Sequence, residues 1–174
     1  MTISQNQKDI LKTIGLITFA TGAIILAPNL LQILKPLNKD KRYRYKKTIK
    51  KLYNDKAIYL SGEEIRLTKK GERLLKQIEV EEITIEPKDS WDGNWHLVCY
   101  DIPEKYKGRR NYLRRKLIEF NFYQIQKSLW VYPYECQEEI AVLCQNIGVA
   151  PFVAYLNTDH LPQQEKLMRL FRLD

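Results

Sequence analysis

The 174-residue chain has little of what builds metal and redox sites. Its three cysteines, Cys99, Cys136 and Cys144, show no Cys-x-x-Cys spacing, and its two histidines, His96 and His160, lie far apart. We therefore expect no zinc site, and an odd number of separate thiols favours a reducing compartment, the cytoplasm. The chain also lacks a Ser-His-Asp, Cys-His or glycine-rich phosphate signature and has no internal repeats. We expect no cofactor.

Near its start the chain has an uncharged run of 22 residues, 13–34, which is long enough to span a membrane. No small-residue cleavage site follows a short apolar segment, so we do not expect a signal peptide. A membrane anchor stays an alternative, because the basic segment that follows would satisfy the positive-inside rule. Polar residues dilute the run and Pro28 divides it, which favours two short helices in the core of a small domain.

Positive charge is concentrated in one segment. Residues 35–56 contain ten Lys or Arg and two Asp, so this segment alone carries a net charge of +8, equal to that of the whole chain. The acidic partners that a solvated helix face usually carries are missing. A localised basic stripe of this kind predicts a surface that binds a polyanion, and we expect that polyanion to be nucleic acid.

Hydrophobic periodicity and turn residues predict a DNA-binding domain over residues 1–80. Three helices are expected first, and a two-stranded hairpin and a further helix with Thr68 as N-cap follow them. A winged helix-turn-helix has this order of elements, with helices followed by a hairpin. The expected helices span 8–26, 28–34, 39–55 and 68–78, and the expected strands span 57–60 and 65–68.

The helix expected at 39–55 has the pattern of a recognition helix. Tyr45, Ile49 and Leu52 recur at helical spacing and form an apolar stripe that would face the core. The opposite side is basic, which suits contacts to phosphates, and its Tyr and Asn side chains can also reach base edges. The predicted DNA-binding residues are Lys39, Arg42, Tyr43, Arg44, Lys46, Lys47, Lys50, Lys51 and Asn54.

An acidic, proline-containing linker at 81–90 leads to a second predicted domain at 91–174. Its elements follow the order strand, helix, strand, strand, helix, strand, which is that of a ferredoxin-like domain. The predicted fold class is therefore α+β, an N-terminal winged helix-turn-helix followed by a ferredoxin-like βαββαβ domain. The expected strands span 95–100, 122–126, 129–132 and 152–157, and the expected helices span 104–119 and 136–146. A short edge strand at 83–86 and a C-terminal helix at 161–173, covering a sheet edge or crossing to a partner, are also expected.

Two runs in the second half resemble a known family. They are WDGNWHLVCYDIPE at 91–104 and QKSLWVYP at 126–133. Both are similar to the central domain of PaaX-type transcriptional repressors, which join an N-terminal winged helix to a domain like the small CRISPR adaptation endonuclease. The resemblance implies a DNA-binding regulator, expected to be a cytoplasmic repressor. It also implies an Arg-rich helix, whose positions are filled here by Arg109, Arg110, Arg114 and Arg115.

The role of Asp101 decides between two functions for the second domain, binding and catalysis. In the endonuclease relatives, the aspartate that ends the first strand is implicated in magnesium binding, and two of them face each other across a dimer. Apart from Glu104, no second carboxylate accompanies Asp101 here, so we expect its side chain to cap the turn before Pro103. The alternatives are a magnesium-dependent nuclease or adaptation subunit, with Asp101 as its catalytic and metal-binding residue, and a membrane-anchored interaction protein.

The DNA-binding protein is expected to be a homodimer formed through its second half. A single winged helix contacts few base pairs of double-stranded DNA, and a two-fold dimer would contact two half-sites. Trp130, Tyr132 and Tyr134 are expected to form an aromatic cluster near one end of the sheet, too large for a small domain to bury. Such clusters favour interfaces.

Overall fold

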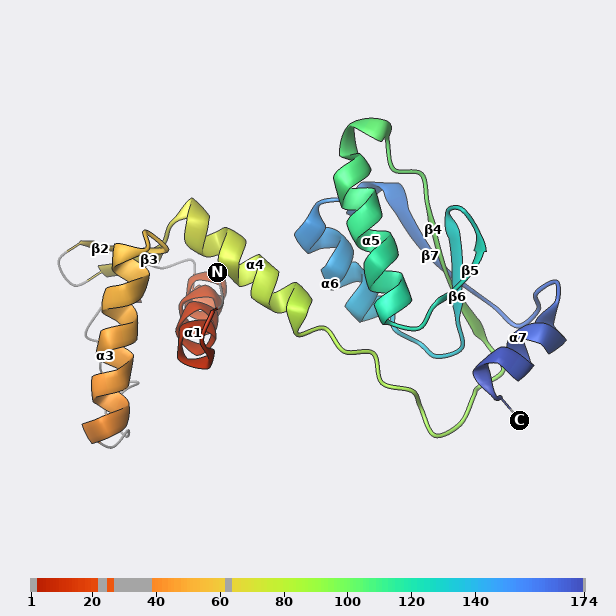
Figure 1. The fold of residues 1–174 in the computed structure, drawn as a ribbon, viewed down its shortest axis with the longest axis horizontal. Coiled ribbons are helices and arrows are strands. Elements are labelled where there is room, and N and C mark those ends of the chain that lie inside the picture. The colour runs from red at the N-terminus through yellow and green to blue at the C-terminus, as the bar shows by residue number, and fades with distance from the viewer. Residues whose placement is uncertain (1–2, 22–24, 27–38, 62–63, 174) are drawn as a thin grey trace. The chain divides into compact units, whose positions relative to one another are not determined.

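A computed structural model describes residues 3–21, 25–26, 39–61 and 64–173 (Figure 1). The chain divides into two compact units, Met1–Glu81 and Glu82–Asp174. Both units combine helices with strands, and the second contains a four-stranded sheet. The α+β class predicted from the sequence is therefore confirmed.

The first unit combines three described helices with a small antiparallel sheet. Its strands lie in the order β1-β3-β2, and Tyr59 of β2 pairs with Arg66 of β3. The elements are α1 (Gln5–Thr21), β1 (Ile25–Leu26), α3 (Lys39–Asn54), β2 (Ile58–Ser61), β3 (Glu64–Leu67) and α4 (Lys69–Glu81).

The uncharged run at 13–34 is described in part. Helix α1 ends at Thr21, and Ile25 pairs with Ile65 in the sheet, so the helix expected to extend to residue 26 is wrong in its last turn. β-branched Ile25 suits a strand, and pairing with β3 satisfies its backbone. The helix expected at 28–34 lies outside the described residues. Among the described residues, no helix is both long enough and apolar enough to cross a membrane.

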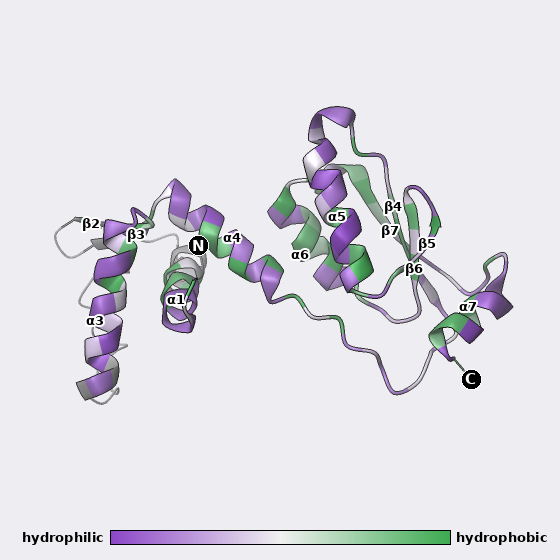
Figure 2. Ribbon diagram, in the orientation of Figure 1, coloured by the Kyte–Doolittle hydropathy of each residue, from purple (hydrophilic) through white to green (hydrophobic). Residues whose placement is uncertain are grey.

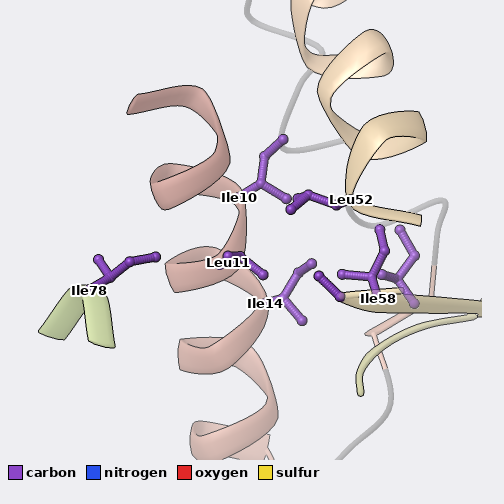
Figure 3. Close-up of a cluster of buried hydrophobic side chains, with 8 residues drawn as sticks. Ile10, Leu11, Ile14, Leu52, Ile58 and Ile78 are labelled. Carbon is purple, nitrogen blue, oxygen red and sulfur yellow. The ribbon is translucent and has the colours of Figure 1, made fainter. Parts of the chain in front are cut away.

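The core of the first unit is built around α1. Ile10, Leu11 and Ile14 lie on one face of this helix and pack with Leu52 of α3 and Ile78 of α4 (Figure 3). All five side chains are at most 2% exposed. Because Leu52 points into this cluster, the opposite side of α3 is turned to solvent.

The second unit is a four-stranded antiparallel sheet in the order β5-β6-β4-β7. Figure 1 shows α5 and α6 side by side against one face of the sheet. The order of strands and helices along the chain is the one expected from the sequence. The elements are β4 (Trp95–Tyr100), the 3-10 turn η1 (Glu104–Tyr106), α5 (Lys107–Glu119), β5 (Tyr123–Gln126), β6 (Leu129–Tyr132), α6 (Gln137–Ile147), the 3-10 turn η2 (Ala150–Phe152), β7 (Val153–Thr158) and α7 (Gln164–Phe171).

The aromatic side chains near the sheet end are buried, which corrects the sequence-based expectation. Trp130 and Tyr132 are 2% and 3% exposed. The indole of Trp130 donates a hydrogen bond to the Tyr100 hydroxyl, and the ring of Tyr132 stacks on Phe122 at 5.0 Å between centroids. Of the three predicted cluster members, only Tyr134 is half-exposed. This cluster therefore gives no support to an interface.

Helix α7 covers a face of the sheet rather than an edge. Leu167 is buried against Trp95, Leu97 and Val131, and the ring of Phe171 lies 6.1 Å from that of Trp95. The short strand expected at 83–86 is wrong, because this described segment has no strand. Its alternating Ile and Thr or Glu residues fit a strand, but they have no neighbouring strand to pair with.

Helix α4 lies so close to the hairpin that adding one methyl group at Gly71 is expected to lower the stability of the first unit. Gly71 donates its backbone N–H to the hydroxyl of Thr68 at 3.1 Å, which confirms Thr68 as the N-cap. A Cβ added at Gly71 would collide with the carbonyl oxygen of Ala57. We expect Gly71→Ala to lower the free energy of unfolding of the first unit by about 1–3 kcal/mol, measured by urea denaturation.

Gly108 supplies the control for this prediction, because a Cβ added there in α5 would meet nothing within 4 Å. Gly108→Ala should leave stability unchanged or raise it by up to about 1 kcal/mol, since alanine favours the helix. Equal destabilisation by both substitutions would show that the collision at Gly71 does not limit the packing of α4.

Candidate nucleic-acid interface

Helix α3 is amphipathic, and its two sides meet different surroundings. Tyr45 and Ile49 pack against the buried cluster of the first unit, and Leu52 is 1% exposed. The spacing expected from the sequence therefore places these three side chains on the core side. Figure 2 shows hydrophilic residues along most of α3, interrupted by isolated hydrophobic positions.

The opposite side of α3 is an exposed, cationic surface, called the basic face of α3 below. Tyr43, the aromatic member of this face, is 70% exposed. In the described part of the chain, Arg44 and Lys46 form no ion pair, nor do Lys47, Lys50 and Lys51. The members of the basic face, all exposed, are Arg42, Tyr43, Arg44, Lys46, Lys47, Lys50, Lys51 and Asn54. The ninth predicted residue, Lys39, begins the helix, but its side chain is outside the described set.

The hairpin of the first unit adds two exposed side chains that sequence reasoning missed. Tyr59 is 55% exposed and lies opposite exposed Arg66, while their strand neighbours Ile58 and Ile65 are buried. The alternation of buried and exposed positions along β2 and β3 could have identified this pair. Aromatic and guanidinium groups together suit contacts with nucleic acid.

A second basic surface lies on η1 and α5. Residues 104–119 carry seven Lys or Arg and two Glu, whereas the rest of the second unit carries five Lys or Arg and eleven Asp or Glu. The net charge of the second unit hides this surface, because the acidic residues elsewhere in the unit cancel its positive charge in the sum. The resemblance had identified four of its members, Arg109, Arg110, Arg114 and Arg115. Counting the charged residues of each expected helix separately would have identified this basic surface.

A pocket of about 320 Å³ lies where the end of β4 meets α5 and the turn between β5 and β6; we call it the Asp101 pocket. Its lining brings together cationic, hydroxyl and carboxylate groups from three parts of the sequence. The lining residues are Tyr100, Asp101, Ile102, Arg110, Arg114, Lys127 and Ser128.

Hydrogen bonds fix the arginines of this pocket. Arg110 donates to the carbonyl oxygen of Ile102 at 3.1 Å and to a carboxylate oxygen of Glu104 at 2.7 Å. This bond to Arg110 lowers the pKa of Glu104, and Lys107 lowers it further. Arg114 donates to the carbonyl oxygen of Lys127 at 3.2 Å. Both guanidinium groups are thus anchored to backbone oxygens.

The carboxylate of Asp101 does not cap its turn. The backbone N–H of Asp101 donates to the carbonyl of Phe152, but among the described residues its exposed carboxylate accepts no hydrogen bond and forms no ion pair. The interpretation of this side chain as a turn cap is therefore wrong. The turn is held instead by backbone pairing and by Arg110 on the Ile102 carbonyl.

Residues 88–168 match the family described as the PaaX protein central Cas2-like domain. The second unit therefore contains a PaaX-type central, Cas2-like domain. The family resemblance read from residues 91–104 and 126–133 is thereby confirmed. Among curated proteins, none matches this chain.

The Asp101 pocket of this PaaX-type domain predicts the outcome of a nuclease assay. Asp101 is the one carboxylate in its lining, and it lies beside Arg110, Arg114 and Lys127. Magnesium requires several oxygen ligands, and arginines and a lysine would repel it. We expect no metal-dependent cleavage of single- or double-stranded DNA or RNA, with magnesium or manganese. Cleavage by the wild type that Asp101→Asn abolishes would establish the nuclease alternative.

Proposed function

We propose that this PaaX-type protein is a DNA-binding transcriptional regulator that acts as a repressor, with a winged helix-turn-helix as its first unit. The observation that carries the proposal is the basic face of α3. Its cations are exposed, and five of them have no acidic partner among the described residues. The family match supports regulation of transcription as the role.

The arrangement of the first unit suits insertion of α3 into the major groove. Burial of Leu52 against α1 fixes the rotation of α3, so its cations lie along one side. Lysine and arginine side chains on such a side neutralise phosphates, and Tyr43 and Asn54 can reach base edges. The paired strands β2 and β3, with Tyr59 and Arg66 exposed, would form the wing.

The proposal includes a homodimer formed through the second unit. The face of the sheet that carries α7 is not fully covered, because Ala154 and Leu156 of edge strand β7 are exposed on it and Cys99 of β4 is half-exposed. Leu156 alone is 52% exposed. We call these residues the open sheet face. A two-fold contact through it would present two recognition helices to two half-sites.

The proposal places the protein in the cytoplasm. The three cysteines are unpaired, and Cys136 and Cys144 are buried. Burial raises the pKa of both thiols to about 12, so they stay protonated at neutral pH and are poor nucleophiles. Unpaired, unreactive thiols are typical of proteins from reducing compartments.

Selection of duplexes from a random pool by the full-length protein tests the proposed function. We expect enrichment of one sequence in two inverted copies, because a two-fold dimer repeats the same contacts on each half-site. A pool with scrambled half-sites should bind more weakly and with a similar salt dependence, since phosphate contacts are independent of sequence. Failure to enrich any sequence would contradict a role as a sequence-specific repressor.

A further inference from the structure

We propose that the Asp101 pocket binds a small phosphomonoester, with its phosphate group on Arg114, Lys127 and Ser128. This site lies entirely within the second unit, and the proposal does not depend on DNA binding by the first. It rests on three features of the pocket: groups without partners, a rigid frame and a matching charge.

Several polar groups of the pocket have no partner within the described part of the chain. The Nζ of Lys127 and the Oγ of Ser128 take part in no hydrogen bond, and the carboxylate of Asp101 is equally unpartnered there. Lys127 and Asp101 are exposed and Ser128 is half-buried. Two donors and one acceptor are therefore open to a ligand at the same pocket.

The turn that carries Lys127 and Ser128 is held from three directions. The hydroxyl of Tyr100 and the guanidinium of Arg114 both donate to the Lys127 carbonyl, at 3.1 and 3.2 Å. The backbone N–H of Tyr100 donates to the Ser128 carbonyl at 3.1 Å. Buried Trp130 in turn donates to the Tyr100 hydroxyl. Donors on a turn fixed in this way need little reorganisation to bind an anion, which increases affinity.

The charge of the pocket matches a phosphomonoester better than a carboxylate. Arg110 is already paired with Glu104, which leaves Arg114 and Lys127 as the cations open to a ligand. A phosphomonoester carries close to two negative charges near neutral pH, and its three terminal oxygens can accept from several donors at once. A carboxylate would carry one charge and leave donors unused.

Asp101 adds a requirement for the organic part of the ligand. An unpartnered carboxylate beside a bound anion repels it, so a bare phosphate ion is disfavoured. A hydroxyl of the ligand that donates a hydrogen bond to the Asp101 carboxylate would offset this repulsion and make the carboxylate contribute to binding. The volume of about 320 Å³ is at the lower end of ligand pockets and suits a ligand the size of a sugar phosphate.

Calorimetric titration of the full chain in EDTA, with ribose 5-phosphate, inorganic phosphate and ribose, tests the site without any metal bridge. We expect ribose 5-phosphate to bind more tightly than inorganic phosphate, and ribose not to bind. Lys127→Ala should weaken binding of both phosphates about tenfold or more. Arg115→Ala is the control, because it removes the same charge from exposed α5 outside the lining, and it should change affinity less than about twofold.

Asp101→Asn separates the role of the carboxylate from that of the cations. This variant should bind inorganic phosphate more tightly than the wild type, because the repulsion is gone, and the advantage of ribose 5-phosphate should shrink. Equal weakening by Lys127→Ala and Arg115→Ala, or an unchanged ratio of the two ligands in Asp101→Asn, would overturn the proposal.

The phosphate could come from a free metabolite or from the end of a nucleic acid strand. Single-stranded oligonucleotides with a 5′-phosphate or a 5′-hydroxyl distinguish these sources. A gain in affinity from the 5′-phosphate that is lost in Lys127→Ala would assign the pocket to strand ends. Binding of ribose 5-phosphate without such a gain would assign it to free phosphomonoesters. Absence of binding by every phosphate probe at millimolar concentration would refute the site.

Discussion

Replacing Lys47, Lys50 and Lys51 of the basic face by alanine should weaken binding to duplex DNA on the order of a hundredfold at moderate salt. Each lysine that contacts a phosphate releases a counterion, so loss of three contacts should also reduce the slope of log K against log salt by about three. The effect should be similar for specific and scrambled duplexes, because phosphate contacts carry no sequence information. Fluorescence anisotropy over a salt series measures both quantities.

A second triple variant controls for net charge. Lys88, Lys166 and Arg169 are exposed residues of the second unit, and their replacement by alanine removes the same three charges. We expect this variant to bind DNA within about threefold of the wild type, because none of the three residues belongs to the basic face of α3. Equal losses in the two variants would mean that the basic face of α3 is not the DNA surface.

Introducing a charge into the open sheet face should dissociate the proposed dimer. Leu156→Arg would place an unpaired guanidinium in an apolar contact, and burying such a charge is costly enough to weaken association a hundredfold or more. Sedimentation velocity at micromolar concentration should show a dimer for the wild type and a monomer for the variant. The monomer should also bind an inverted-repeat duplex much more weakly than the dimer, because it contacts one half-site at a time.

Val142→Arg is the matched control for this substitution. Val142 is 41% exposed on α6 and is not part of the sheet. This variant should remain a dimer, and near-ultraviolet circular dichroism should show that both variants keep their packing. A monomeric wild type, or a Leu156→Arg variant that stays dimeric, would remove the open sheet face as the interface.

Local patterns in the sequence predicted α3 with the greatest accuracy. The expected helix at 39–55 ends within one residue of the observed one, because charged residues surround a regular apolar stripe. The strands of the second unit were found to within one residue for the same reason: Val, Leu, Trp and Tyr alternate between the two faces. These features depend on residues within one or two turns of each other, which a single sequence displays directly.

Features that depend on distant residues were predicted poorly. Nothing near Trp130 shows that Tyr100, thirty positions away, accepts its N–H, so burial of the aromatic cluster was missed. Strand β1 has only two residues, and its partner Ile65 lies forty positions along the chain. We also did not expect the Asp101 carboxylate to lack a hydrogen-bond donor among the described residues, since a turn before a proline usually provides backbone donors for an aspartate.

Because basic and acidic residues of the second unit lie in different places, its basic surface on α5 attracts a polyanion only over a short distance. The charges of its twelve basic and thirteen acidic residues nearly cancel, so the net force of this unit on a distant polyanion is close to zero. Only within about a Debye length, roughly 10 Å at 0.1 M salt, does it meet α5 separately from the acidic remainder. The first unit has seventeen basic and eight acidic residues and attracts a polyanion from further away. Lowering the ionic strength should therefore speed DNA capture through the first unit, while encounters with α5 stay confined to close contact.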